Sequence, residues 1–113
     1  MPMNPPKSIG LLRKFVSTAR SVTTGQVSLP LGIMRLERNL YWLAQYDIRP
    51  LSDEELKTVN AYCSRIKEFP IEQERTYWEP NTLQSLDEKL ERITAKYQPR
   101  LLSILVRIVT ETA

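Results

Sequence analysis

Apolar side chains recur along most of the chain at the three- and four-residue spacing that is typical of amphipathic α-helices. The clearest stretch is 28–47, where five of them form one stripe: Leu29, Ile33, Leu36, Leu40 and Leu43. Gly32 lies beside this stripe and predicts the close approach of a neighbouring helix, because glycine inside a helix is otherwise unfavourable. Ser28 is the expected N-cap, and Pro30 suits the first turn. We therefore predict a central helix that ends near Asp47.

The opposite side of this central helix carries polar and aromatic groups: Met34, Arg35, Arg38, Tyr41, Trp42 and Gln45. A helix with two such faces is either enclosed in the middle of a bundle or presents its second face to a partner. Arg35, Arg38, Tyr41 and Trp42 are therefore the first candidate binding surface.

Similar spacing predicts helices on both sides of the central one. The first covers residues 7–23 and ends near Gly25; its apolar stripe is Ile9, Leu12, Val16, Ala19 and Val22 or Thr23, flanked by Leu11 and Phe15. A capping box of Ser52 and Glu55 predicts the start of a third helix that ends near Glu68. A fourth, over 81–98, has the stripe Leu83, Leu86, Leu90, Ile93 and Tyr97.

Pro99 either kinks this fourth helix or begins a fifth. Seven of the nine residues in 101–109 are apolar, which predicts burial within the bundle or against another chain. The expected fold is all-α, a compact antiparallel bundle of four to five helices. We expect one domain over residues 1–113, with residues 1–6 as a proline-rich flexible arm.

The segment 69–80 lies between the third and fourth helices and is bounded by two prolines. It is predicted to form one short helix from Pro70 or an irregular loop. The general preference of tryptophan for burial favours packing of Trp78 against the bundle. The alternative is a second candidate binding surface made of Glu74, Tyr77 and Trp78, since exposed aromatic residues anchor interfaces.

The composition removes most of the usual catalytic and metal-binding groups. The chain has no histidine and one cysteine, Cys63, which lies on the apolar stripe of the third helix and is expected to be structural. Gly10, Gly25 and Gly32 are too far apart for a phosphate-binding loop. We therefore predict no catalytic residue, no cofactor, no metal site and no enzymatic activity.

Charge is distributed unevenly along the chain. The formal net charge is +3, but residues 1–50 hold seven Lys or Arg against two acidic residues, and residues 51–113 hold nine against eleven. The first half thus offers a basic stripe of Arg13, Lys14, Arg20, Arg35 and Arg38, to which Tyr41 and Trp42 could add base stacking. The alternative is that these cations only solvate amphipathic helices.

The amino-terminal sequence has no secretory-signal pattern, and no apolar run is long enough to span a membrane. A cytoplasmic protein is therefore expected.

One spacing resembles a known class of proteins. It runs from Ala19-Arg20 through Gly25 and Gly32 to Arg35-Leu36, and it is similar to a pattern in small helical bacterial proteins that include immunity proteins of polymorphic toxin systems. The resemblance implies a helix pair, joined by a glycine-containing turn, that begins a bundle able to bind and block a cognate toxin. Nuclease inhibitors of this kind tend to be acidic, so the basic chain here fits a target with an acidic rim better.

The leading hypothesis is a small non-enzymatic protein-binding module, with toxin neutralisation as its specific form. The alternatives are a nucleic-acid-binding protein that uses the basic first half, and a self-assembling subunit that dimerises through 101–109 with Leu102 or Val106 at the interface.

Overall fold

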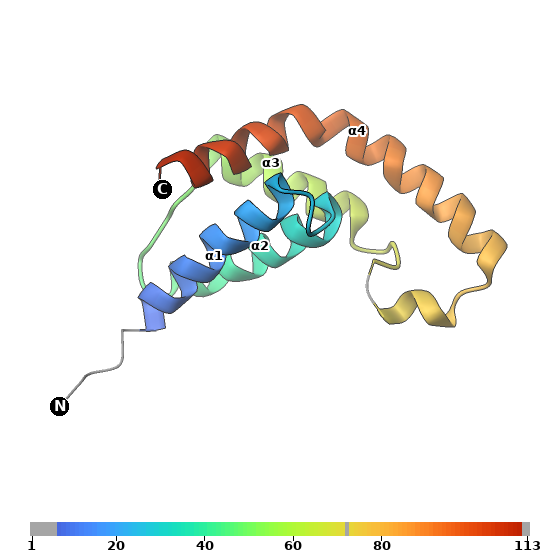
Figure 1. The fold of residues 1–113 in the computed structure, drawn as a ribbon, viewed down its shortest axis with the longest axis horizontal. Coiled ribbons are helices and arrows are strands. Elements are labelled where there is room, and N and C mark those ends of the chain that lie inside the picture. The colour runs from blue at the N-terminus through green and yellow to red at the C-terminus, as the bar shows by residue number, and fades with distance from the viewer. Residues whose placement is uncertain (1–6, 72, 112–113) are drawn as a thin grey trace.

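The computed structural model describes residues 7–71 and 73–111. They form four α-helices and one 3₁₀ helix, and no strand lies within these residues (Figure 1). The elements are α1 (Lys7–Thr23), α2 (Leu29–Ala44), α3 (Asp53–Ile66), η1 (Gln73–Tyr77) and α4 (Pro80–Glu111). This confirms the all-α bundle. The proline-rich arm predicted at residues 1–6 lies outside the described residues.

The four α-helices form a ring in which each packs against two others. The contacting pairs are α1–α2, α2–α3, α3–α4 and α4–α1, of which α1–α2 is the most extensive and α2–α3 the least. The core inside the ring is apolar, with Phe15, Ile33, Tyr62 and Leu105 fully buried. In α1 the buried residues are Phe15, Ala19 and Val22, whereas Ile9 is exposed. The predicted α1 stripe was therefore centred one position away from the true core face.

Gly32 lies where α2 meets α1. It is buried, and a Cβ at this position would overlap the side chain of Val22 and touch that of Val27. The predicted close helix approach is confirmed. The chain enters this contact through a turn in which Gly25 has a left-handed φ of 80°, and the N–H of Gln26 donates to the carbonyl of Ser21 at 2.8 Å. Glycine adopts that conformation without a steric penalty.

The turn after the carboxyl end of α2 also contains a residue with a left-handed φ, but this residue is not a glycine. Asp47 has a φ of 59°, and the N–H of Ile48 donates to the carbonyl of Leu43 at 3.1 Å. Helical hydrogen bonding thus ends at Ala44, and a turn over residues 45–47 completes the predicted central stretch.

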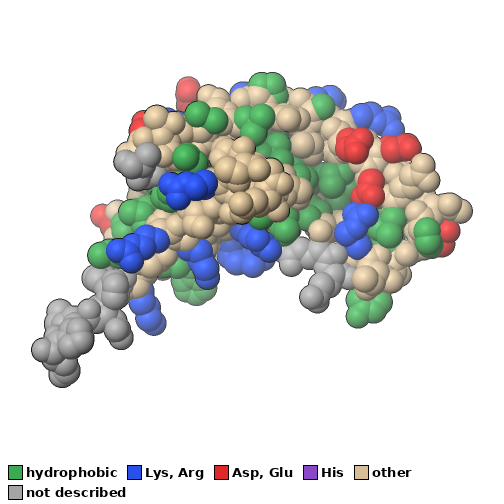
Figure 2. All heavy atoms as spheres, viewed as in Figure 1, with side chains coloured by type: hydrophobic (Ala, Val, Ile, Leu, Met, Phe, Trp, Pro, Cys, Tyr) green, Lys and Arg blue, Asp and Glu red, His purple; other side chains and the backbone are tan. Residues whose placement is uncertain are grey.

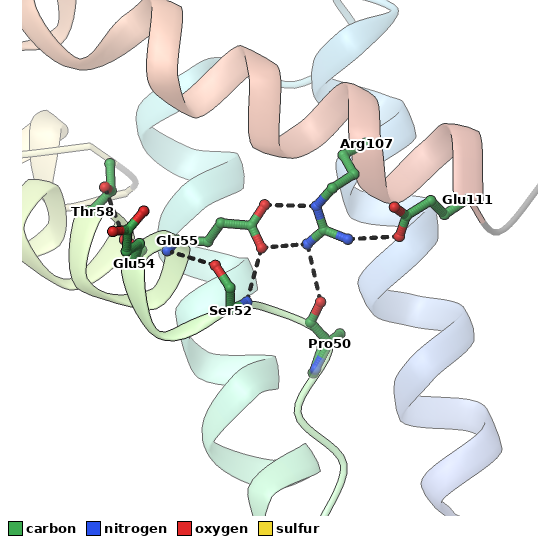
Figure 3. Close-up of polar contacts among 7 residues, drawn as sticks. All are labelled: Pro50, Ser52, Glu54, Glu55, Thr58, Arg107 and Glu111. Atoms are coloured by element: carbon green, nitrogen blue, oxygen red, sulfur yellow. Dashed lines mark hydrogen bonds and ion pairs between the residues drawn. The ribbon is translucent and has the colours of Figure 1, made fainter.

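A capping box begins α3, as predicted: the Ser52 side chain accepts from the Glu55 N–H at 3.2 Å, and Glu55 accepts from the Ser52 N–H at 2.9 Å. The Glu55 carboxylate also receives two hydrogen bonds from Arg107 of α4, at 2.6 and 2.5 Å (Figure 3). Arg107 further donates to the Pro50 carbonyl and to Glu111. One guanidinium therefore joins the start of α3 to the end of α4.

Pro99 lies inside α4, so the last two predicted segments are one continuous helix. Pro99 and Ala95 are both exposed, which leaves solvent able to hydrate the Ala95 carbonyl that loses its helical hydrogen bond. All fully buried residues of α4 follow Pro99, and its first half, 80–98, extends beyond the other helices (Figure 1). Of the two alternatives for 101–109, complete burial within the bundle was wrong, because Val106 is 54% exposed, and burial against another chain stays a prediction.

The segment between α3 and α4 contains η1 instead of a helix from Pro70. The predicted packing of Trp78 into the bundle was wrong: Trp78 is 42% exposed. Arg75 holds η1 in place, because its guanidinium binds both carboxylate oxygens of Asp87 on α4 at 2.8 Å and the Pro70 carbonyl at 3.0 Å. The indole that follows is thereby fixed at the surface.

Replacing Gly32 by alanine should destabilise the protein by about 1–3 kcal/mol, because Val22 is buried and its β-branched side chain has few rotamers with which to yield. The matched control is Gly10→Ala on α1. A Cβ there meets open space, so this change should stabilise by about 0.5–1 kcal/mol. Urea unfolding followed by circular dichroism measures both, and equal stabilities for the two variants would contradict the packing described.

Glu55→Gln should lower the free energy of unfolding at pH 7 by about 1–2 kcal/mol, since the Arg107 pair is only partly screened by solvent. Burial acts to raise the pKa of the Glu55 carboxyl, but the hydrogen bonds from Arg107 and Ser52 and the Arg107 charge outweigh it and hold the pKa below its usual value. The stabilisation by the ionised Glu55 is therefore fully present above the pKa that this carboxyl has in the unfolded chain. It is lost as pH falls through the lower pKa that the carboxyl has in the folded protein.

Urea unfolding of the unchanged chain and of Glu55→Gln at pH 7 and near pH 3 tests this pH dependence. The difference in the free energy of unfolding between the two proteins should shrink at the lower pH. Glu54→Gln is the control, because the Glu54 side chain is exposed and has no ion pair within the described residues. A difference for Glu55→Gln that does not depend on pH would rule out the ionised pair as its source.

Candidate functional site

The first candidate surface is exposed along the outer side of α2. Arg35, Arg38, Tyr41 and Trp42 all lie there, and the two aromatic side chains are 63% and 51% exposed. The rings of Tyr41 and Trp42 meet edge to face with centroids 5.2 Å apart, so each restricts the other. The next residue, Leu43, is completely buried and fixes the helix orientation from the core side.

The second candidate surface lies elsewhere. Tyr77 at the end of η1 is 89% exposed, and Trp78 follows it. Glu74 belongs to η1, but its side chain lies outside the described part of the structure. The carboxyl end of α2 and η1 are at opposite ends of the molecule (Figure 1), so the two candidate surfaces do not form one site.

An open groove of about 660 Å³ follows the line between α2 and α3. Tyr41 and Arg38 stand on its α2 side, next to Trp42, and Cys63 lies at its floor. The remaining lining residues are Met34, Glu37, Leu40, Ala44, Ile48, Arg49, Leu51, Asp53, Leu56, Asn60 and Lys67. The groove is therefore mainly apolar inside, with charged groups at its edges.

Cys63 shows what chemistry the floor of the groove permits. Burial raises the pKa of its thiol to about 12, and the nearby Glu37 carboxylate adds to the effect. The thiol is therefore protonated at neutral pH and is a poor nucleophile. Its sulfur lies 4.0 Å from the Ile33 carbonyl across the α2–α3 contact. The predicted position of Cys63 on the buried stripe of α3 is confirmed.

Several carboxylates that could serve in acid–base chemistry are used to hold the fold. Glu79 accepts hydrogen bonds from the N–H groups of Asn81 and Thr82 at the start of α4, which lowers its pKa. Hydrogen bonds from Arg75 lower the pKa of Asp87 in the same way. Among the residues described, no group of three or more His, Cys, Asp or Glu side chains could hold a metal ion.

Basic side chains are spread over the part of the surface formed by α1 and α2, and acidic and basic side chains are mixed over the first half of α4 (Figure 2). Arg13, Lys14 and Arg20 on α1 are exposed, like Arg35 and Arg38 on α2. Within the described residues none of these five cations forms an ion pair. Their charge is therefore available to an anionic partner.

Two features of this region are absent from the sequence predictions. The groove had no local signal, because it depends on how far α2 and α3 separate in space. Arg107 did carry a signal: a charged residue that interrupts an apolar run requires a partner when its helix packs against the core. Glu55 supplies that partner. From the sequence, Glu55 is assigned to the capping box alone, which is a sufficient reason for a glutamate at this position.

No protein-family model matches the chain, and no curated protein or solved structure matches it. None of the helices in the described part of the chain combines the length and apolarity that crossing a membrane requires. The features available for a function are the exposed aromatic pair, the groove beside it and the basic side chains without ion partners.

Proposed function

We propose that the protein is a non-enzymatic protein-binding module whose binding surface is the Tyr41–Trp42 pair together with the adjoining α2–α3 groove. The observation that carries this proposal is an exposed pair of aromatic rings in edge-to-face contact, of which Tyr41 lines an apolar groove. Large aromatic side chains supply much of the energy of protein interfaces and do so best beside pockets that exclude water.

The rigidity of the pair supports the same proposal. Tyr41 and Trp42 lie on a helix that is held by core contacts on its other side, so little conformational freedom is left to lose on binding. Arg35 and Arg38 on the same side of α2 favour a partner with negative charge. Neutralisation of a toxin with an acidic rim, the role that the sequence resemblance implies, is one specific form of this function.

Trp42→Ala should reduce capture of the principal partner at least tenfold, because loss of a central aromatic anchor weakens an interface by about 2 kcal/mol or more. The measurement is a pull-down with the tagged full chain from cells of its source organism, with captured proteins quantified by mass spectrometry. Trp78→Ala is the matched control: it removes an indole of similar exposure from the other end of the molecule.

If Trp78→Ala abolishes capture and Trp42→Ala does not, the binding surface is the Tyr77–Trp78 region and the α2 proposal fails. Equal capture by the unchanged chain and both variants would contradict an aromatic anchor at either place. Circular dichroism of each variant separates loss of binding from loss of the fold.

A second candidate function is nucleic-acid binding, which the exposed cations of α1 and α2 favour. In this case affinity for a fluorescein-labelled 20-nucleotide single strand should fall steeply between about 50 and 200 mM salt, as counterion release requires. Arg13→Glu combined with Arg20→Glu should weaken binding further, whereas Lys57→Glu on α3 should have little effect. Fluorescence anisotropy measures both, and a salt-independent affinity would exclude this function.

The third prediction, self-assembly through 101–109, remains a proposal. Val106 is 54% exposed and Leu102 is half-buried, so both can contribute to a contact between copies of the chain.

A further inference from the structure

We infer that the α2–α3 groove binds an amphipathic α-helix of a partner protein, one with acidic residues beside its apolar stripe. This inference rests on the proposed binding function and specifies what the partner must present to it.

The first argument is the course of the groove along two helices. On α2 its lining runs from Met34 through Arg38 and Tyr41 to Ala44, and on α3 it includes Leu56, Asn60, Cys63 and Lys67. These residues recur every three or four positions, so the groove follows the same faces of α2 and α3 for about three turns, or about 15 Å. A further helix fits such a line because its side chains pack between the ridges of two neighbouring helices.

The second argument is the unequal packing within the ring. The α1–α2 contact is the most extensive, and Gly32 brings these two helices close together, while α2–α3 is the least extensive of the four contacts that form the ring. Apolar side chains between α2 and α3 are consequently only half-buried, among them Met34, Leu40 and Leu56. An apolar stripe from a partner would complete their burial, which is the main favourable term in helix association.

The third argument is the charge along the groove. Lys67 lies at one end, Arg38 near the middle, and Arg49 near the other end. Arg49 has only a long contact of 3.9 Å with Asp47, in which both side chains are largely exposed. The lining also holds two acidic residues, Glu37 and Asp53, against these three cations, so its charged side chains sum to +1. Acidic flanks therefore suit this groove better than basic ones.

Three fluorescein-labelled peptides of about 18 residues test the inference, a length at which a helix can form on binding. The first has leucines at helical spacing with glutamates beside them, the second has lysines in place of the glutamates, and the third has the composition of the first in an order that removes the stripe. Fluorescence anisotropy with the full chain should show at least tenfold tighter binding of the first than of either other peptide.

Two pairs of variants test whether the acidic peptide binds in the groove. Asn60→Trp fills the groove from α3 and should abolish binding of the acidic peptide, whereas Ala61→Trp, on the next and exposed position outside the lining, should leave it unchanged. Arg38→Glu should weaken binding about tenfold, and Arg65→Glu, an exposed position on α3 outside the lining, less than threefold. Circular dichroism verifies that each variant is folded.

Equal binding of the acidic and basic peptides, or no effect of Asn60→Trp, would overturn the inference. It would also be overturned if the chain alone sediments as a dimer that Asn60→Trp dissociates, because the occupant of the groove would then be a second copy of the chain.

Pull-down with the same variants separates failure of this inference from failure of the proposed function. Partner capture that depends on Trp42 but not on Asn60 would leave a binding module with a different kind of partner, whereas capture that depends on neither would overturn both.

Discussion

The close contact between Gly32 and Val22 is the constraint on which the α1–α2 pair depends. Because Gly32 has no Cβ, the Val22 side chain packs directly against the α2 backbone, within the most extensive helix contact in the molecule. The side of α2 that faces α3 makes a smaller contact, and the groove occupies the space that remains. The position of one glycine is thus connected to the exposure of the surface that we assign to partner binding.

On the other side of the ring, two arginine side chains join neighbouring elements. Arg107 ties the last turns of α4 to the start of α3, and Arg75 ties η1 to α4 at Asp87. Both guanidiniums bind a carboxylate through two hydrogen bonds and add a backbone carbonyl, an arrangement that fixes direction as well as distance. Of the core side chains of α4, Leu101, Ile104 and Leu105 lie between these two attachments, and Ile108 follows directly after Arg107.

Local signals in the sequence were sufficient for the helices and for several specific contacts. The capping box joins Ser52 to Glu55, three positions later, and the buried Cys63 follows from one helical stripe, so both could be predicted. The exposure of Trp78 could not, because it results from the Arg75–Asp87 pair, which joins two elements with no common sequence pattern. The exposure of Tyr41 and Trp42 agrees with one of the two alternatives that the pattern left open, while the groove beside them depends on helix separation and has no sequence signature.

Closure of the ring by α4 has a consequence for the order in which the chain can fold. The α1–α2 hairpin needs only contacts that are near in sequence, but α1 also packs against α4, which occupies the last part of the chain. During synthesis from the amino terminus, the core faces of α1 and α3 remain uncovered until α4 emerges. Loop-closure entropy makes this long-range step slower than the hairpin. A chain that stops before Arg107 would lack the hydrogen bonds that join α4 to Glu55 at the start of α3, so the ring would close without this attachment.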